Sequence, residues 1–220
     1  LLARKHAGHV LPAPKGFGIG GTKNFYFAHM SNCLYDCRYC FLQGMYMSAN
    51  YVLFVNFEDF DRQINNLIKQ HPNENLTFFS GYDCDSLAFE SVTGFAAHIL
   101  PTFKKYGSAT LEFRTKSVQV RPLDKMPPIE NCVVAYSLMP DIMSNALDHK
   151  APSIEKRLQA IKLLAEKGWK VGLRFDPLIH GANWELLYSD LFERVFEAIP
   201  QNAIHSVSYG PLRFPQSMFR

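Results

Sequence analysis

The sequence lacks the marks of membrane, repeat and secreted disulfide proteins. No apolar run approaches the roughly 18 residues that a membrane-spanning helix needs, so we expect no membrane span. No internal repeat and no low-complexity tract is visible. Nothing near Leu1 resembles a signal peptide, and the abrupt ending "LRFPQSMFR" predicts a core truncated at both ends.

The sequence also lacks a large excess of one charge, because 23 basic and 20 acidic residues leave a net charge of only +3. The basic residues are spread along the chain, which favours a solvated mixed surface over one basic patch. Charge alone therefore does not identify the partner.

Cysteines are few, and three of the five lie within eight positions in "SNCLYDCRYCFLQG" (31–44). A secreted disulfide scaffold would be smaller and more evenly cross-linked. An odd, crowded set favours a reducing, cytoplasmic location and a metal or redox role.

Strand-like and helical segments alternate along the chain. Apolar runs predict six strands, at 23–30, 75–81, 109–117, 131–140, 170–179 and 204–212. Apolar residues at helical spacing predict helices at 57–71, 91–107, 151–169 and 184–199, with Pro101 as a kink or break and Ser153 as a cap. This alternation predicts an α/β fold with a parallel sheet, either a partial barrel or an open doubly wound sheet. We expect residues 1–22 to form an extension and residues 23–220 the core domain.

Polar residues collect where the predicted strands end. In parallel α/β folds the chemistry lies at the carboxyl ends of the strands. The segments concerned are the cysteine loop, Ser80–Asp85, Thr115–Ser117, Ser137, Asp176 and Tyr209–Arg213. They are expected to form one face.

The spacing C-x3-C-x2-C of Cys33, Cys37 and Cys40 has a chance of about one in a thousand if the cysteines were shuffled, which makes chance crowding a poor explanation. Structural zinc sites take four ligands, and His29 is the available fourth ligand. Three thiolates fit a [4Fe–4S] cluster better, because one iron then stays open to a cofactor that brings its own amine and carboxylate. Zinc remains the alternative.

This motif, with Tyr39 and Phe41 flanking its last cysteine and placed after the first predicted strand, resembles the radical S-adenosylmethionine superfamily. The resemblance implies a partial (β/α)6 barrel, a [4Fe–4S] cluster and S-adenosyl-L-methionine. It also implies reductive cleavage of that cofactor to a 5′-deoxyadenosyl radical, which abstracts a hydrogen atom from the substrate.

A narrower resemblance rests on four segments together. "CRYCFLQG", "FRTKS" (113–117), the stretch 151–179 and "LRFP" (212–215) are similar to the spore photoproduct lyase family. The resemblance extends from about residue 10 to the end and implies a lyase that repairs thymine photodimers in DNA. It also implies an electron donor such as ferredoxin or flavodoxin.

The resemblance implies a set of cofactor contacts. Lys116 would hold the cofactor carboxylate, and Ser137 its ribose or amine. The other expected contacts are Tyr39, Phe41, Ser80, Gly81 and Arg174. Four of these residues have an ordinary structural alternative: a surface lysine for Lys116, turn residues for Ser137 and Gly81, and pairing with Asp176 for Arg174.

The family returns a hydrogen atom to the product from a cysteine near the end of the second strand. Cys84 is the natural candidate here, although the register places that donor nearer Tyr82. The family has a tyrosine directly after the last cluster cysteine, where this chain has Phe41, which carries no O–H. Cys132, at the head of an apolar strand, is expected to be a buried structural thiol.

Three functions remain open at this stage. The first is a radical lyase acting on photodimers in DNA. The second is an enzyme of the same family with another substrate, for which Phe41 and the displaced cysteine are adaptations. The third is a metal-binding module without catalysis.

Overall fold

The computed structural model describes residues 1–46 and 48–213. Its large sheet has the strand order β12-β11-β9-β8-β7-β3-β2. The bounds are β2 (Val10–Pro12), β3 (Lys23–Phe27), β7 (Leu76–Ser80), β8 (Ala109–Thr115), β9 (Cys132–Ser137), β11 (Lys170–Leu178) and β12 (Ile204–Pro211). All neighbouring pairs are parallel except β2 with β3, and these pairs confirm the six predicted strands.

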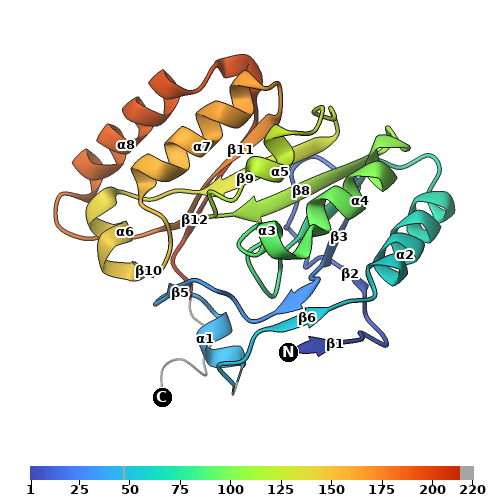
Figure 1. The fold of residues 1–220 in the computed structure, drawn as a ribbon. Helices are drawn as coiled ribbons and strands as arrows, with labels where there is room; N and C mark the ends of the chain where they lie inside the picture. The colour runs from blue at the N-terminus through green and yellow to red at the C-terminus, as the bar shows by residue number, and fades with distance from the viewer. Residues whose placement is uncertain (47, 214–220) are drawn as a thin grey trace.

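The connections place helices on one side of this sheet (Figure 1). The long helices are α2 (Phe57–Gln70), α4 (Phe95–Lys104), α7 (Ile154–Glu166) and α8 (Trp184–Ala198); shorter ones are α3 (Glu90–Thr93), α5 (Arg121–Asp124) and α6 (Asp141–Leu147). Every second residue of the inner strands packs against these helices, as in Leu111 and Phe113 of β8. The fold is the predicted α/β partial barrel, with β12 and β2 at its open edges.

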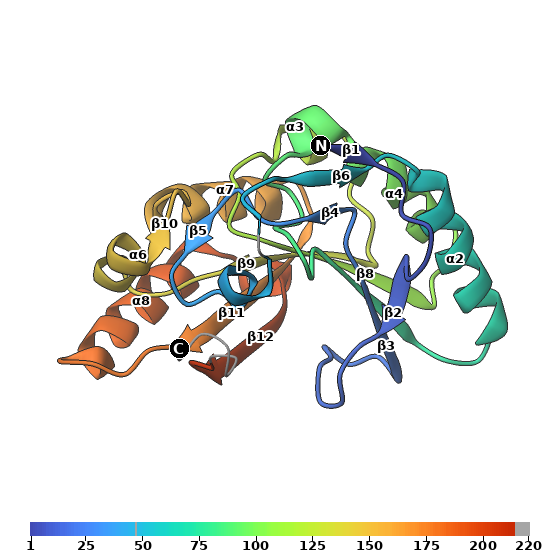
Figure 2. The same ribbon diagram turned by 90° about the horizontal axis from the view of Figure 1, so that it is seen from below.

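Small elements lie on the other side of the sheet. β1 (Leu2–Ala3), β6 (Val52–Phe54) and β4 (Met30–Ser31) form a three-stranded sheet, which Figure 2 shows from below. β5 (Asp36–Cys37) pairs with β10 (Asp148–His149), and α1 (Leu42–Met45) follows the cysteine loop. Residues of the predicted extension thus supply β1 and the edge strand β2.

The point at which one predicted helix breaks was wrong. The helix expected at 91–107 is divided at Gly94, whose φ is +61°, and α4 then continues through Pro101. The Glu90 carboxylate accepts hydrogen bonds from the Ala96 N–H and so satisfies a free donor at the start of α4. Ser153 caps α7 as predicted, by accepting from the Lys156 N–H.

No helix within the described part of the chain combines the length and the apolar character that crossing a bilayer demands.

Candidate functional site

The three motif cysteines lie together in a partly buried cluster that begins after β4 and includes β5. Cys37 packs with Tyr35 and Ala88, and Cys33, Tyr39 and Cys40 join the same group. None of the three is in a disulfide. Burial raises the pKa of both Cys33 and Cys37 to about 12, and it raises the pKa of Cys40 as well. In the absence of a metal, these groups are therefore neutral thiols at pH 7.

The donor set fits an iron–sulfur cluster. Over residues 1–46 and 48–213, no three His, Cys, Asp or Glu side chains meet closely enough to hold a single metal ion. A four-iron cluster takes each thiolate on a different iron, so it requires a shared neighbourhood rather than a common point. Cys33, Cys37 and Cys40 provide such a neighbourhood.

His29, the alternative fourth zinc ligand, belongs to the hydrophobic core instead. Its ring stacks on Phe95 with centroids 4.0 Å apart and meets Phe57 edge-on. Burial lowers the pKa of His29 to about 3, so the ring is neutral.

The backbone ties the cysteine loop to the segment between α6 and α7. In the β5–β10 pairing, Cys37 lies opposite Asp148, and the Arg38 N–H donates to the Leu147 carbonyl over 2.9 Å. The Tyr39 hydroxyl donates to Asp148 Oδ1. The loop is therefore positioned by a residue more than a hundred positions further along the chain.

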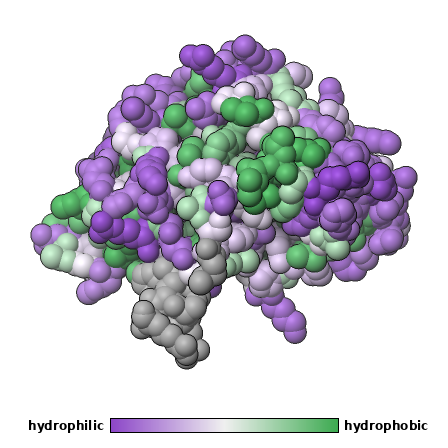
Figure 3. Space-filling view, turned by 60° about the horizontal axis from the view of Figure 1, so that its bottom comes forward, coloured by the Kyte–Doolittle hydropathy of each residue, from purple (hydrophilic) through white to green (hydrophobic). Residues whose placement is uncertain are grey.

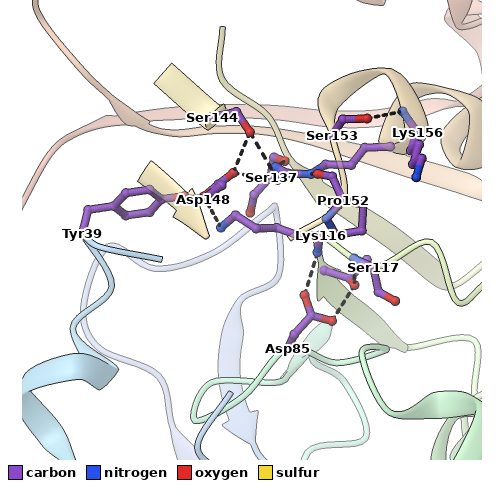
Figure 4. A network of polar contacts seen from close by, with 12 residues as sticks. Tyr39, Asp85, Lys116, Ser117, Ser137, Ser144, Asp148, Pro152, Ser153 and Lys156 are labelled. Carbon is purple, nitrogen blue, oxygen red and sulfur yellow. Dashed lines mark hydrogen bonds and ion pairs between the residues drawn. The ribbon is translucent and has the colours of Figure 1, made fainter. Parts of the chain in front are cut away.

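Lys116 lies at the centre of this arrangement (Figure 4). Its Nζ is 3.8 Å from Asp148 Oδ1 and 5.2 Å from the centre of the Tyr39 ring. Burial alone would lower the pKa of Lys116, but Tyr39, Cys37 and Asp148 raise it above its ordinary value. Lys116 is therefore a largely buried cation with a side chain 14% exposed, not the surface lysine that was its alternative.

Asp85 holds the backbone of Lys116 in place. Its carboxylate accepts from the Thr115 hydroxyl and from the Lys116 N–H, both over 2.6 Å. A third bond comes from the Leu87 N–H over 3.0 Å. Burial raises the pKa of Asp85, and these hydrogen bonds oppose that rise.

Asp148 is shared between Lys116 and a buried arginine. Arg157 Nη2 donates to Asp148 Oδ2 over 2.7 Å, and Nη1 donates to the Ser137 carbonyl over 3.0 Å. Burial alone would raise the pKa of Asp148, but Lys116 and Arg157 together hold it below its usual value. Ser137 lies beside Lys116 at the end of β9, because Tyr136 pairs with Thr115 of β8 (Figure 4).

Ser80 and Gly81 form a tight turn after β7. Gly81 has φ +81°, and a Cβ there would lie 2.4 Å from Ser86 Oγ, so the turn itself requires glycine. The Ser80 carbonyl accepts from the Ser86 hydroxyl over 2.7 Å. Ser80 Oγ is buried without a hydrogen-bond partner within the described residues.

The two hydrogen-donor candidates point to different surroundings. Cys84 is buried with Ala28 and Met30. Tyr82 is half-buried and packs on Tyr26 with centroids 4.1 Å apart, and Phe41 is 5.6 Å away. Tyr82 therefore lies beside Phe41 of the cysteine loop, whereas Cys84 is buried closer to Cys33, and Phe89 packs against both.

Arg174 lies deeper in the barrel. It donates to Glu112 over 2.7 Å, to the Ser206 hydroxyl over 2.9 Å and to two backbone carbonyls. The alternative pairing of Arg174 with Asp176 was wrong, because Asp176 pairs with Arg114 over 3.2 Å. Cys132 is fully buried in the main core, as predicted.

Three site residues escaped the sequence-based assignment: Asp148, Arg157 and, as the anchor of Lys116, Asp85. Only Asp85 had a signal, because it falls within the polar segment Ser80–Asp85. The others become visible only when distant segments meet.

Comparison with known proteins decides the family. The family model "Spore photoproduct lyase" matches residues 23–215. The chain therefore belongs to the spore photoproduct lyase family. This confirms the resemblance drawn from the cysteine loop and the segments that accompany it.

Curated members of the spore photoproduct lyase family share about a quarter of the residues. The spore photoproduct lyase of Bacillus subtilis (strain 168) is 24% identical over 180 residues, which are 81% of this chain and 53% of the relative. That of Geobacillus sp. (strain Y412MC61) is 26% identical over 170 residues, 75% and 49% of the two chains. The chain spans about half the length of the curated relatives it matches.

Solved spore photoproduct lyase structures share the fold. A double mutant with bound AdoMet and dinucleoside spore photoproduct matches with a TM-score of 0.84 at 20% identity, over 89% of this chain and 58% of that one. A tyrosine-to-phenylalanine mutant matches with a TM-score of 0.80 at 21% identity, over 88% and 58%.

Proposed function

We propose that this chain is the core of a radical S-adenosylmethionine lyase that repairs spore photoproduct in DNA. The proposal rests mainly on one observation: Cys33, Cys37 and Cys40 pack together with Tyr39, and the largely buried cation Lys116 lies over the Tyr39 ring, in a chain of the spore photoproduct lyase family. When bound, a [4Fe–4S] cluster and S-adenosylmethionine supply the 5′-deoxyadenosyl radical that abstracts hydrogen.

The chain's own residues bind and orient the cofactor. The three cysteines hold the cluster, and Lys116 holds the carboxylate of S-adenosylmethionine. Ser137, Ser80 and the backbone at Gly81 line the strand ends, while Tyr39 and Phe41 shield the loop. Arg174 stays outside this set, because a ligand would have to displace Glu112 and Ser206 from it.

Tyr82 takes the place of the hydrogen donor, with Cys84 as the less accessible candidate. The phenol O–H breaks as the product C–H forms, which leaves a phenoxyl radical on Tyr82. Reduction of that radical takes one electron from the protein donor, a ferredoxin or flavodoxin, and one proton. The half-buried position of Tyr82, in contact with Tyr26 and 5.6 Å from Phe41 of the cysteine loop, supports this assignment.

The mouth presents a mixed surface to a partner. In Figure 3 apolar side chains gather over β1 and β6, where Leu1, Leu2 and Val55 are exposed, with hydrophilic side chains around them. Duplex DNA containing the photoproduct is the proposed partner, and its binding should weaken steeply with salt. We place the protein in the reducing cytoplasm, where free thiols persist.

Anaerobic reconstitution followed by reduction in the presence of S-adenosylmethionine tests this proposal. We expect about four irons and four sulfides per chain, and formation of 5′-deoxyadenosine with repair of a photoproduct-containing oligonucleotide. 5′-Deoxyadenosine without repair would favour another substrate in the same family. Bound zinc with no cofactor cleavage would leave only the non-catalytic module.

A further inference from the structure

Three charged residues share the inner face of β8 and its extension. Glu112, Arg114 and Lys116 are two positions apart, so their side chains leave the strand on the same side. Each forms an ion pair across the barrel interior or its mouth. The pairs are Glu112–Arg174 at 2.7 Å, Arg114–Asp176 at 3.2 Å and Lys116–Asp148 at 3.8 Å.

The first pair closes the floor of the barrel. Arg174 and Glu112 have side chains only 2% and 1% exposed. Small residues make room for the guanidinium: a Cβ on Gly172 would lie 2.7 Å from Arg174 Nη2 and 2.9 Å from the Ala135 Cβ. This pair is sealed from any ligand.

The middle pair is the accessible one. The side chains of Arg114 and Asp176 are 26% and 30% exposed, whereas those of Lys116 and Asp148 are 14% and 0% exposed. Arg114 lies one step below Lys116 on the same face of β8, so it lines the interior beneath the proposed cofactor site.

The middle pair also has hydrogen-bonding capacity to spare. Arg114 Nη2 donates to Asp176 Oδ2, and no other hydrogen bond to Asp176 is found within the described residues. Gly210 approaches Asp176 Oδ1 with its backbone alone, and a Cβ there would lie 3.4 Å from that oxygen and 3.8 Å from Arg213 Nη2, so a second guanidinium lies nearby. An acceptor oxygen and guanidinium donors therefore stand side by side in the barrel.

We propose that Arg114 and Asp176 recognise the substrate by the imide edge of a pyrimidine base. This inference rests on the proposed function. An imide N–H donates to Asp176 while a neighbouring carbonyl accepts from Arg114. A neutral group satisfies both partners and leaves no charge unpaired. A bare phosphate or carboxylate would meet the repulsion of Asp176, and a lone cation that of Arg114.

Calorimetric titration of the reconstituted chain with two probes tests the inference. The probes are the dinucleoside spore photoproduct and the same compound methylated at the pyrimidine N3 atoms, which removes the imide donors. Methylation should weaken binding to the wild-type chain about 10-fold or more. Asp176→Leu should weaken binding of the unmethylated probe by a similar factor and remove the discrimination between probes, and Arg114→Met should also weaken binding.

Asp124→Leu is the matched control, because Asp124 also forms a 3.2 Å ion pair, with Lys167 on the helical side of the sheet. It should leave both affinities unchanged. The methylated probe tests the contact on the unaltered protein, so the inference stays testable even if Asp176→Leu does not fold.

Equal binding of the two probes by the wild-type chain, or discrimination that survives in a folded Asp176→Leu, would overturn the inference alone. If the wild-type chain bound neither probe, both the inference and the proposed DNA substrate would fall. 5′-Deoxyadenosine formation in the same preparation would then show whether the radical chemistry stands.

Discussion

Two buried arginine–carboxylate pairs, Arg174–Glu112 and Arg157–Asp148, have the same 2.7 Å separation but different surroundings. At the floor of the barrel, Arg174 also donates hydrogen bonds to the carbonyl and the hydroxyl of Ser206. Asp148 is shared with Tyr39 and Lys116 at the mouth. The same chemical pair thus joins strands in one region and aligns a candidate cofactor site in the other.

Arg174→Met breaks the floor pair and leaves the Glu112 carboxylate buried without a counter-charge. The free energy of unfolding should fall by about 3–5 kcal/mol, as measured by urea denaturation. Adding Glu112→Leu should restore most of it. Lys167→Met, which breaks the partly exposed pair with Asp124, should cost about 1 kcal/mol; an equally small loss in Arg174→Met would refute the buried-pair account.

Replacing both partners at the mouth, in Asp148→Leu/Arg157→Met, should impair function more than the equivalent double replacement at the floor. The variant avoids an unpaired buried arginine, yet Tyr39 loses its acceptor and Lys116 its carboxylate. Formation of 5′-deoxyadenosine should fall about 100-fold, because small displacements of positioning groups have effects of that size. The floor double variant Glu112→Leu/Arg174→Met should stay close to wild type in the same assay, and equal losses in both would remove the distinction.

Lys116→Met removes one cation at the mouth and leaves the buried Arg157–Asp148 pair intact. Asp148 keeps Arg157 as its partner, so we expect only a modest change in stability. Affinity for S-adenosylmethionine should fall about 10- to 100-fold in equilibrium dialysis, because a charge-assisted contact to the carboxylate is lost. Iron content should not change. Lys150→Met, at an exposed lysine near the same loop, should bind the cofactor normally.

His29 extends the comparison to a buried basic group without a counter-charge. Its pKa is about 3 in the folded chain and near 6.5 when unfolded, so the folded state resists protonation. The contribution of the neutral His29 ring to the free energy of unfolding is fully present above pH 6.5 and is lost as the pH falls toward 3. Between pH 7 and pH 5 the wild-type chain should lose about 2 kcal/mol that His29→Leu does not lose, as measured by urea denaturation at each pH.

A pH dependence that is identical in the two proteins would contradict the neutral, buried assignment of His29.

The strands and long helices follow from local pattern, because a face that packs on helices must be apolar at a fixed period. The helix division at Gly94 was missed because the Glu90 side chain and the left-handed glycine, rather than Pro101, decide it. A proline within a helix removes one hydrogen bond and is tolerated when packing compensates, as in the buried α4.

The site was predictable only where one segment carries its own chemistry. The spacing of Cys33, Cys37 and Cys40 is local, and it led to the family. The partners of Lys116 are not local, because Asp148 comes from a short strand that exists only through its pairing with β5. The partners of Arg174 likewise come from β8 and β12, and no pattern within β11 indicates them.

The central claim is that Cys33, Cys37, Cys40 and Lys116 form one cluster and cofactor site. Electron paramagnetic resonance of the reduced, reconstituted chain, recorded with and without S-adenosylmethionine, tests it most directly. We predict a [4Fe–4S] signal that changes when the cofactor is added, and a signal in Lys116→Met that needs about 10-fold or more cofactor for the same change. A chain that holds zinc, or a cluster signal indifferent to the cofactor, would contradict it.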